Sequence, residues 1–240
     1  MNRALVIIAT YNEAENISTI IEKILKQNDC CDVLIVDDNS PDGTGTIVEE
    51  LSKKNNRIFL IKRKEKLGYG TAFIEGFNFA IEKNYDIIIS MDADFSHNPE
   101  DINRFLEQIN NYALVIGSRY IGGIRIINWP LRRLILSTFA NKYVRLITGL
   151  PFYDCTSGFR CYKTDILKRI NYKTVKSNGY SFLVELLYRA YKSKAKIKEI
   201  PIIFTERSGG KSKMSKKVIF EAFLTPIVCR FFSYKIANKK

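Results

Sequence analysis

The sequence predicts one α/β domain in which a mostly parallel central sheet is flanked by helices. Short apolar runs of β-forming residues alternate with helical patterns through the first half of the chain, which is typical of a doubly wound parallel sheet. Polar clusters follow directly after several of these runs, where ligands bind in such sheets. The length of 240 residues suits one domain with a large buried core.

The predicted strands are continuous apolar runs, as expected for strands that are buried on both faces. They cover residues 5–8, 33–36, 58–61, 87–91 and 113–116, and a later strand covers residues 197–204. Pro201 within the last run indicates an edge strand or the start of a strand, because proline cannot donate a hydrogen bond to a neighbouring strand.

Between these strands, apolar residues recur at helical spacing and therefore predict amphipathic helices. One face of the first helix carries Ile17, Ile20, Ile21, Ile24 and Leu25. Further helices pass through residues 47–51, 73–81, 102–109 and 182–190, and a longer helix covers residues 131–147.

The composition points to an anionic partner. The net charge of +13 is unusual for a globular chain and fits a nucleic acid, a phosphorylated substrate or an acidic lipid. The five cysteines show no CxxC spacing and favour a reducing compartment, and a single histidine, His97, argues against a histidine-based metal site. No signal-peptide pattern opens the chain, and no apolar run reaches the roughly 20 residues that span a bilayer. We therefore expect a cytosolic protein, or one that lies on a membrane without crossing it.

Asp92 and Asp94, directly after the apolar run 87–91, are the first candidates for chemistry. Two carboxylates one residue apart can share a hard divalent cation that also binds a diphosphate. The alternative is an Asp-rich turn that only precedes the next helix, with Asn98 as its N-cap. Polar clusters at residues 9–13 and 37–43 favour a nucleotide site, since the carboxyl ends of parallel strands share one edge of the sheet.

The second half of the chain changes character, because residues 118–153 contain no acidic residue. Within the predicted helix 131–147, Arg133, Ser137 and Asn141 recur every four residues and so share one face. Such a stripe can hold a phosphate, and an ordinary solvated face is the alternative. Residues 154–160 are predicted to form a compact polar loop.

Two basic segments follow towards the C-terminus. Residues 206–215 are rich in glycine, serine and cations, which is typical of loops that close over phosphates or, alternatively, of a flexible basic tail. Residues 218–234 are apolar but interrupted by Glu221, Pro226 and Arg230, so we expect them to lie in the plane of a membrane interface rather than to cross it.

Four motifs in the first half resemble those of family-2 glycosyltransferases with the GT-A fold. They are Thr-Tyr-Asn-Glu at 10–13, Asp-Asp-Asn-Ser-Pro-Asp-Gly-Thr at 37–44, Leu-Gly-Tyr-Gly-Thr-Ala at 67–72 and Asp-Ala-Asp-Phe-Ser-His-Asn-Pro at 92–99. Later motifs at 117–120, 129–133, 154–160 and 206–214 are similar to those of dolichyl-phosphate and polyprenyl-phosphate mannose synthases. The resemblance covers nearly the whole chain, in order.

The resemblance implies an inverting enzyme that moves mannose from GDP-mannose to a dolichyl or other polyprenyl monophosphate and gives a β-linked product. It implies a divalent metal, Mg²⁺ or Mn²⁺, a peripheral position on the cytoplasmic side of a membrane, and small membrane subunits as candidate partners. A polyprenyl-phosphate glucosyltransferase, or another family-2 enzyme that uses a UDP-sugar, is the alternative. One GT-A domain would cover residues 1–240, with a nucleotide-sugar half at 1–120, an acceptor half at 121–215 and a basic amphipathic segment at 216–240.

The resemblance also assigns roles to single positions. The catalytic positions are Asp94, Arg119, Arg207 and Lys213, the metal positions Asp94 and Ser96, and the acceptor-phosphate positions Arg133 and Ser137. The nucleotide-sugar positions are Ala9, Tyr11, Glu13, Val36, Asp38, Asp92, Ala93, Asp94, Arg119, Arg207 and Lys213. The chain departs from the family at Ala9, where proline is usual, and Ser96 stands where some members have glutamine, whose oxygen can serve the same metal.

Two rival functions make different demands on the chain. A soluble GT-A enzyme with a hydroxyl acceptor would need a carboxylate base, for which Asp154 and Glu185 are the candidates. A phosphate monoester needs no strong base, because its second pKa is about 6 and it is mostly ionised at neutral pH. The other rival is a basic module that binds nucleic acid. We expect no nucleic-acid partner, because the cations flank Gly-Ser loops and apolar helices rather than an aromatic platform.

Overall fold

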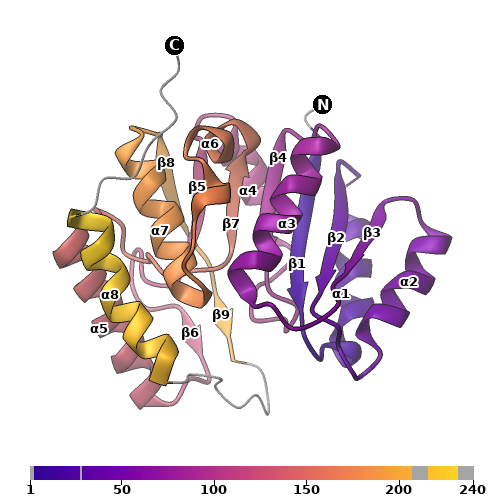
Figure 1. Ribbon diagram of the computed structural model, residues 1–240, viewed down its shortest axis with the longest axis horizontal. Helices are drawn as coiled ribbons and strands as arrows, with labels where there is room; N and C mark the ends of the chain where they lie inside the picture. The colour runs from indigo at the N-terminus through magenta and orange to yellow at the C-terminus, as the bar shows by residue number, and fades with distance from the viewer. Residues whose placement is uncertain (1–2, 28, 207–215, 232–240) are drawn as a thin grey trace.

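Seven strands form the central sheet of the computed structural model, which describes residues 3–27, 29–206 and 216–231 (Figure 1). The strands are β1 (Ala4–Thr10), β2 (Cys31–Asp37), β3 (Ile58–Lys62), β4 (Ile87–Met91), β5 (Leu114–Ser118), β7 (Arg160–Lys163) and β8 (Ile197–Pro201). Their spatial order is β3-β2-β1-β4-β7-β5-β8, and of these described strands only β7 runs antiparallel to its neighbours.

The helices connect these strands and cover both faces of the sheet (Figure 1). They are α1 (Ala14–Gln27), α2 (Thr44–Lys54), α3 (Tyr69–Glu82), α4 (Asp101–Ile109), α5 (Leu131–Thr148), α6 (Thr164–Arg169), α7 (Gly179–Lys192), α8 (Lys216–Phe231) and the short 3-10 helix η1 (Tyr172–Thr174). A second, two-stranded sheet pairs β6 (Ile126–Ile127) with β9 (Phe204–Thr205). The structure therefore confirms the predicted fold class, an α/β domain with a mostly parallel sheet flanked by helices.

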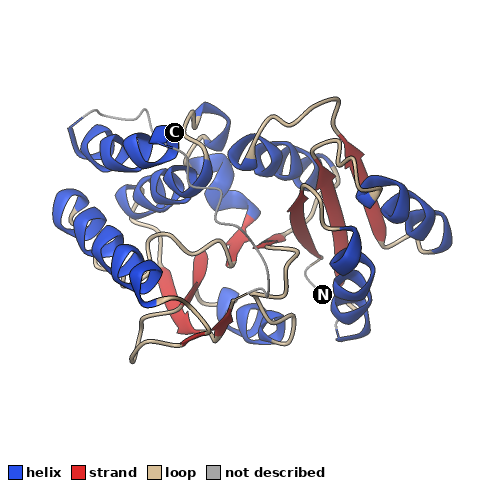
Figure 2. Cartoon of the chain, turned by 90° about the horizontal axis from the view of Figure 1, so that it is seen from below, coloured by secondary structure: helices blue, strands red, loops and turns tan. Residues whose placement is uncertain are grey.

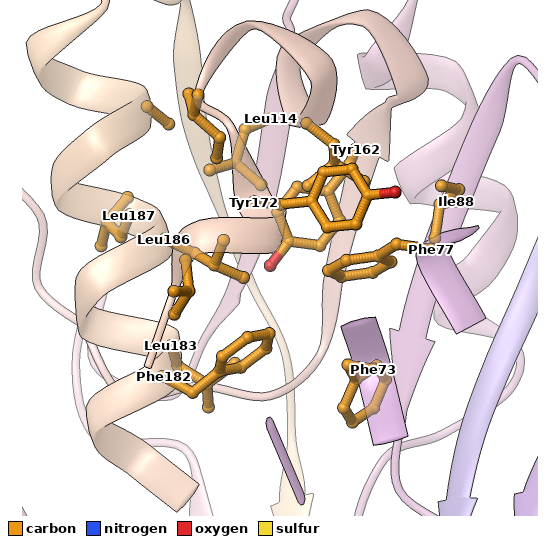
Figure 3. Packing of buried hydrophobic residues seen from close by; sticks show 14 of the residues in the cluster. Phe73, Phe77, Ile88, Leu114, Tyr162, Tyr172, Phe182, Leu183, Leu186 and Leu187 are labelled. Carbon is orange, nitrogen blue, oxygen red and sulfur yellow. The ribbon is translucent and has the colours of Figure 1, made fainter. Parts of the chain in front are cut away.

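The core consists of two apolar clusters, one on each face of the sheet, because successive strand residues point to opposite faces. On one face, Phe73 and Phe77 of α3 pack with Tyr162 of β7 and Leu186 of α7 (Figure 3). On the other face, α1 contributes Ile17, Ile20, Ile21 and Ile24, and α4 contributes Ile102, Phe105 and Ile109. The apolar faces predicted for these helices are therefore the faces that the structure buries.

The strand register brings the ends of β1, β2 and β4 to one edge of the sheet. Thr10, the last residue of β1, lies opposite Asp37, the last residue of β2, and Ile8 lies opposite Met91, the last residue of β4. In Figure 1 these strands run downwards from the N-terminus, so Figure 2, seen from below, faces their carboxyl ends. The polar clusters that the sequence places after these strands therefore lie side by side.

Two elements differ from the sequence-based expectation, and one agrees with it. The loop predicted for residues 154–160 ends one residue earlier, because Arg160 begins β7, which inserts between β4 and β5. The strand predicted for residues 197–204 is divided into β8 and β9, because the chain leaves the main sheet after Pro201. Pro201 ends β8, an edge strand, as its missing donor predicted.

Helices α5 and α8 pack against each other at one end of the molecule (Figure 1). The rings of Tyr143 and Phe223 stack with their centroids 5.2 Å apart, and the Tyr143 hydroxyl donates to the Phe223 carbonyl at 2.9 Å. Within the ranges that the structure describes, no helix is both long and apolar enough to cross a bilayer.

Candidate functional site

The ends of β1 and β2 are joined by a buried carboxylate that the sequence did not single out. Asp37 accepts hydrogen bonds from the Thr10 hydroxyl at 2.8 Å and from the backbone and hydroxyl of Ser40 at 2.9 and 2.6 Å. It is fully buried. Asp37 therefore holds in place the turn after β2, which begins with Asp38.

Asp38 is fixed by a buried arginine. Its Oδ1 lies 2.7 Å from Nη1 of Arg63, and its Oδ2 accepts the Gly68 N–H at 3.1 Å. Arg63 also donates to the Thr71 hydroxyl at 2.6 Å. The pair links the end of β2 to the start of α3, so the Asp38 carboxylate has a defined orientation.

The other predicted nucleotide positions on β1 and β2 gather at the same edge. Ala9 and Val36 are register partners in the sheet. The Lys66 ammonium lies 3.6 Å from the ring centroid of Tyr11, and Glu13 accepts the Asn16 side chain while its own N–H donates to Thr44. Five predicted residues, counting Asp38, thus lie in β1 and β2 or directly after them, at the same edge of the sheet.

The loop that carries Asp92 and Asp94 has a fixed shape. The Asp92 N–H donates to Nδ1 of His97 at 3.1 Å, and the Ser96 N–H donates to Oδ1 of Asp94 at 3.1 Å. Burial lowers the pKa of His97 to about 4, so the imidazole is neutral and its Nδ1 can accept. Phe95 adopts a left-handed φ of 58°, which is rare for a bulky residue and typical of strained functional loops.

The oxygen atoms in this loop suit a divalent cation. Partial burial and the charge of Asp94 raise the pKa of Asp92 to about 7, because both disfavour a second negative charge in this loop. The Ser96 Oγ is buried and has no hydrogen-bond partner within the described part of the chain. Among the same residues no cluster of three or more histidine, cysteine, aspartate or glutamate side chains occurs, so a cation would need further ligands from water or a diphosphate.

Arg119 and Asp154 form a buried bidentate ion pair. Nε and Nη2 of Arg119 each lie 2.7 Å from a carboxylate oxygen, and the Arg119 N–H donates to Asp154 at 3.0 Å. Burial alone would raise the pKa of Asp154, but the Arg119 guanidinium holds that pKa below its usual value. Asp154 is therefore ionised, and both of its carboxylate oxygens accept hydrogen bonds from Arg119. These oxygens are not available to take a proton from a substrate, so Asp154 does not suit the role of a general base.

Two further buried side chains brace this pair. Glu199 accepts the N–H groups of Tyr153 and Asp154, both at 2.8 Å. Asn141 accepts the Cys155 N–H at 2.8 Å and donates to Thr156. Asn141 thus faces the interior, whereas Arg133 and Ser137, the other two members of the Arg-Ser-Asn stripe, line an apolar pocket. The second rival base, Glu185, is buried and paired with Arg189 at 2.6 Å.

An apolar pocket of about 280 Å³ lies between α5, α7 and α8 and contains both predicted acceptor residues. Arg133 and Ser137 line it together with Arg119 and Trp129. The Ser137 hydroxyl accepts a hydrogen bond from Tyr120 at 2.7 Å, and the Arg133 guanidinium lies 4.2 Å from the Trp129 ring. The other predicted catalytic residues, Arg207 and Lys213, lie outside the described residues.

Gly158 allows the loop after Asp154 to approach the Asp92 loop. A Cβ at this position would lie 2.7 Å from the Tyr69 hydroxyl and 3.7 Å from the Asp92 carboxylate. We expect Gly158→Ala to lower the free energy of unfolding by about 1–3 kcal/mol, because the rigid tyrosine ring must move. Tyr69→Phe removes the clashing oxygen and should relieve most of this loss in the double variant. Urea titrations of the four proteins test both statements; an unrelieved loss would mean that the strain lies elsewhere.

The comparisons with known proteins agree with this geometry. Residues 5–170 match the model of the family described as glycosyl transferase family 2. The chain is 42% identical over 222 residues to the polyprenol monophosphomannose synthase of Mycolicibacterium smegmatis, covering 92% of this chain and 84% of the relative. It is 40% identical over 220 residues to the undecaprenyl-phosphate mannosyltransferase of Micrococcus luteus, covering 92% and 90%.

A solved structure supports the fold assignment. Glucosyl-3-phosphoglycerate synthase of Mycobacterium tuberculosis, solved with Mn²⁺, uridine diphosphate and glucosyl-3-phosphoglycerate, aligns with a TM-score of 0.67 at 15% identity. The alignment covers 95% of this chain and 80% of that one. The match in sequence and the GT-A architecture agree, and the chain is a glycosyltransferase that belongs to glycosyl transferase family 2.

Proposed function

We propose that this chain transfers mannose from GDP-mannose to a polyprenyl monophosphate such as dolichyl phosphate, with inversion at the anomeric carbon. The observation that carries the proposal is an apolar pocket with Arg133 and Ser137 on its wall, which suits a lipid with a phosphate head. The names of the two relatives from Mycolicibacterium smegmatis and Micrococcus luteus support the choice of sugar and acceptor.

The donor would lie across the carboxyl ends of β1, β2 and β4. Asp38, held by Arg63, presents its carboxylate where a nucleobase can donate to it. Asp94 and Ser96 would hold Mg²⁺ or Mn²⁺, which stabilises the negative charge that develops on the departing diphosphate. The remaining predicted residues would complete the donor site: Ala9, Tyr11, Glu13, Val36, Asp92 and Ala93. The resemblance to the family assigns Arg207 and Lys213 to the donor diphosphate.

Arg119 connects the donor and acceptor sides. It lines the apolar pocket, and its positive charge partly offsets the rise in the pKa of Asp92. The guanidinium is held by Asp154 and Thr156, so its position does not depend on either substrate. A cation fixed between the two sites can stabilise the diphosphate and the acceptor phosphate as they approach each other.

The acceptor phosphate supplies its own nucleophile. It is mostly ionised at neutral pH, so transfer needs orientation rather than a base. Both carboxylates that could have served as a base are bound in buried ion pairs, Asp154 with Arg119 and Glu185 with Arg189. In-line attack from the pocket side gives a β-linked product from an α-linked donor, and an α-linked product would contradict the proposal.

A donor panel tests the function. The chain is incubated with Mg²⁺, a short polyprenyl phosphate and, in turn, GDP-mannose, UDP-glucose and UDP-N-acetylglucosamine, and sugar lipid is measured after organic extraction. We expect product from GDP-mannose. Product from a UDP-sugar only would keep the acceptor but assign a different donor, and no product with any donor in detergent would contradict the lipid acceptor.

Arg133→Ala separates the acceptor site from the donor site. The variant should raise the acceptor KM by about tenfold or lower kcat, because a charge-assisted contact to the phosphate is lost. The donor KM should stay within about twofold of the wild-type value. Steady-state kinetics with each substrate varied in turn measure this, and an equal rise in the donor KM would move Arg133 to the donor subsite.

The exposed faces of α5 and α8 are suited to a membrane surface on the cytoplasmic side. Apolar side chains that are at least half exposed include Leu131, Ile135, Leu136, Phe139 and Leu146 on α5, and Phe220, Phe223 and Phe231 on α8. The two helices lie side by side, so these residues extend the apolar character of the pocket to the protein surface (Figure 1).

Co-sedimentation with anionic vesicles tests whether this surface binds a membrane. The double variant Phe139→Asp with Phe220→Asp should abolish the co-sedimentation. If the wild-type chain did not sediment, attachment through a small membrane subunit would be favoured.

A further inference from the structure

The acceptor-site arginine already has an anion. Nη1 of Arg133 donates to Oε1 of Glu206, and the guanidinium stacks on Trp129 at 4.2 Å. The side chains of Arg133 and Glu206 are 35% and 18% exposed, so the pair is partly shielded from water. Glu206 therefore neutralises a cation that the proposed acceptor phosphate would need.

The backbone places Glu206 at this position. Its N–H donates to the Ile127 carbonyl at 3.0 Å, directly after the short pairing of β6 with β9. The Phe204 N–H donates to the Arg125 carbonyl at 2.9 Å and fixes the preceding turn. The carboxylate is thus delivered from a strand end rather than from a freely rotating surface chain.

Two polar atoms at the Arg133–Glu206 pair lack hydrogen-bond partners within the ranges that the structure describes, which favours replacement of Glu206 by an anion that can engage more donors. Oε2 of Glu206 is buried and has no hydrogen-bond partner among the described residues, and the same holds for Nε1 of Trp129. A buried carboxylate oxygen without a partner loses its hydration without compensation. A phosphate with three oxygens could engage the same guanidinium more fully than Glu206 does.

We propose that Glu206 is an internal displacing anion, which lowers the affinity of the Arg133 site for phosphate and thereby promotes release of the lipid product. The inference rests on the proposed function, because it assumes that the acceptor phosphate binds Arg133. For every anion that uses the site, the apparent affinity equals the intrinsic affinity multiplied by the fraction of molecules in which Arg133 is not paired with Glu206. The acceptor must displace the carboxylate to bind, and the carboxylate returns as the product leaves.

The charges of substrate and product explain why this helps turnover. The acceptor is a phosphate monoester with a charge of about −1.5 to −2. Transfer forms one bond from a phosphate oxygen to the anomeric carbon and breaks the bond to the departing diphosphate, so the product is a phosphodiester of about −1 charge. The product therefore binds a guanidinium less strongly than the acceptor does, and an internal competitor of about −1 charge is matched to displace it.

The chain carries its own probe for this site. Trp129 is the only tryptophan, and it lies against the Arg133 guanidinium. Its fluorescence can be titrated with farnesyl phosphate, a monoester, and with farnesyl methyl phosphate, a diester that stands in for the product. We expect Glu206→Gln to bind both lipids about fivefold more tightly than the wild-type chain, since the competing ion pair is removed.

Three variants make the test specific. Glu206→Asp, whose shorter side chain weakens the pair, should tighten binding in the same direction by a smaller factor. Glu49→Gln removes an exposed carboxylate paired only with Lys53 and should leave both affinities unchanged. In an Arg133→Ala background, Glu206→Gln should have no effect, because the competition acts only through Arg133.

The outcomes separate the two proposals. If wild-type fluorescence responds to neither lipid, the acceptor site itself is misassigned. If the wild-type chain binds but Glu206→Gln and Glu206→Asp bind equally or more weakly, Glu206 only braces Arg133 and the displacing role is overturned. In turnover, the displacing role also predicts a lower acceptor KM and stronger product inhibition for Glu206→Gln, at an unchanged donor KM.

Discussion

Asp94→Ala should abolish glycosyl transfer, with a fall in kcat of about 10³-fold or more. Asp94 lies in a loop in which Phe95 has a left-handed φ and the Ser96 N–H donates to the Asp94 carboxylate, so this carboxylate has a defined position. A diphosphate without its cation cannot leave readily, because its developing charge is not stabilised. The effect should appear in kcat at saturating donor and metal.

A second readout separates chemistry from folding. Binding of Mn²⁺ in the presence of GDP should be lost in Asp94→Ala, while the unfolding midpoint should change little because Asp94 is only half-buried. Asp29→Ala, which removes a fully exposed carboxylate, is the matched control and should keep both metal binding and activity. Near wild-type turnover of Asp94→Ala at saturating Mg²⁺ would contradict the metal assignment.

Asp154→Asn should lower the free energy of unfolding by about 3–5 kcal/mol, because it leaves the Arg119 guanidinium buried without its counter-charge. The substitution keeps the shape of the side chain. Chemical denaturation measures the loss. For comparison, Glu49→Gln, which breaks an exposed pair with Lys53, should cost less than about 1 kcal/mol.

The double variant Arg119→Met with Asp154→Leu should recover much of this stability but no activity. Replacing a buried ion pair by apolar residues of similar volume is often neutral or stabilising, whereas the cation proposed to lie between donor and acceptor is lost. If Asp154→Asn were as stable as the wild-type chain and yet inactive, Asp154 would act as a catalytic base, and a hydroxyl acceptor would become the better reading.

The sequence was sufficient to predict the parallel half of the sheet. The apolar runs that became β1, β2 and β4 end in polar clusters, and the register of parallel strands brings those clusters to one edge. The helical faces that pack on these strands follow from the spacing of isoleucine, as in α1. The spacing of apolar residues therefore predicts secondary structure well where strands and helices are long and alternate along the chain.

The short antiparallel strand β7 could not be predicted. Arg160 to Lys163 contains two polar residues of four, and the segment becomes a strand only because β4 and β5 lie on either side of it. Arg160 is fully buried because the carbonyl groups of Ser157, Leu183 and Cys155 accept its hydrogen bonds. Ser157 and Cys155 are near Arg160 in sequence and Leu183 is 23 residues away, but only the folded loop turns all three carbonyl groups towards the guanidinium, and composition does not identify them.

The candidate site shows the same division. Its carboxylates stand at strand ends and were visible in the sequence, but the side chains that hold them were not. Arg63 lies in the charged segment Lys62 to Lys66, where nothing distinguishes the one cation that turns inward to Asp38. Glu199 and Asn141, which brace Asp154, are contacts between distant segments that only tertiary structure brings together.

The position of β7 also determines the order in which the sheet can be completed. β1, β2, β3 and β4 pair among themselves as the chain emerges, whereas β5 has as neighbours only β7 and β8, both of which are synthesised later. Until residue 163 is present, the open edge of β4 and the whole of β5 lack their strand partners, which slows folding and exposes an aggregation-prone edge.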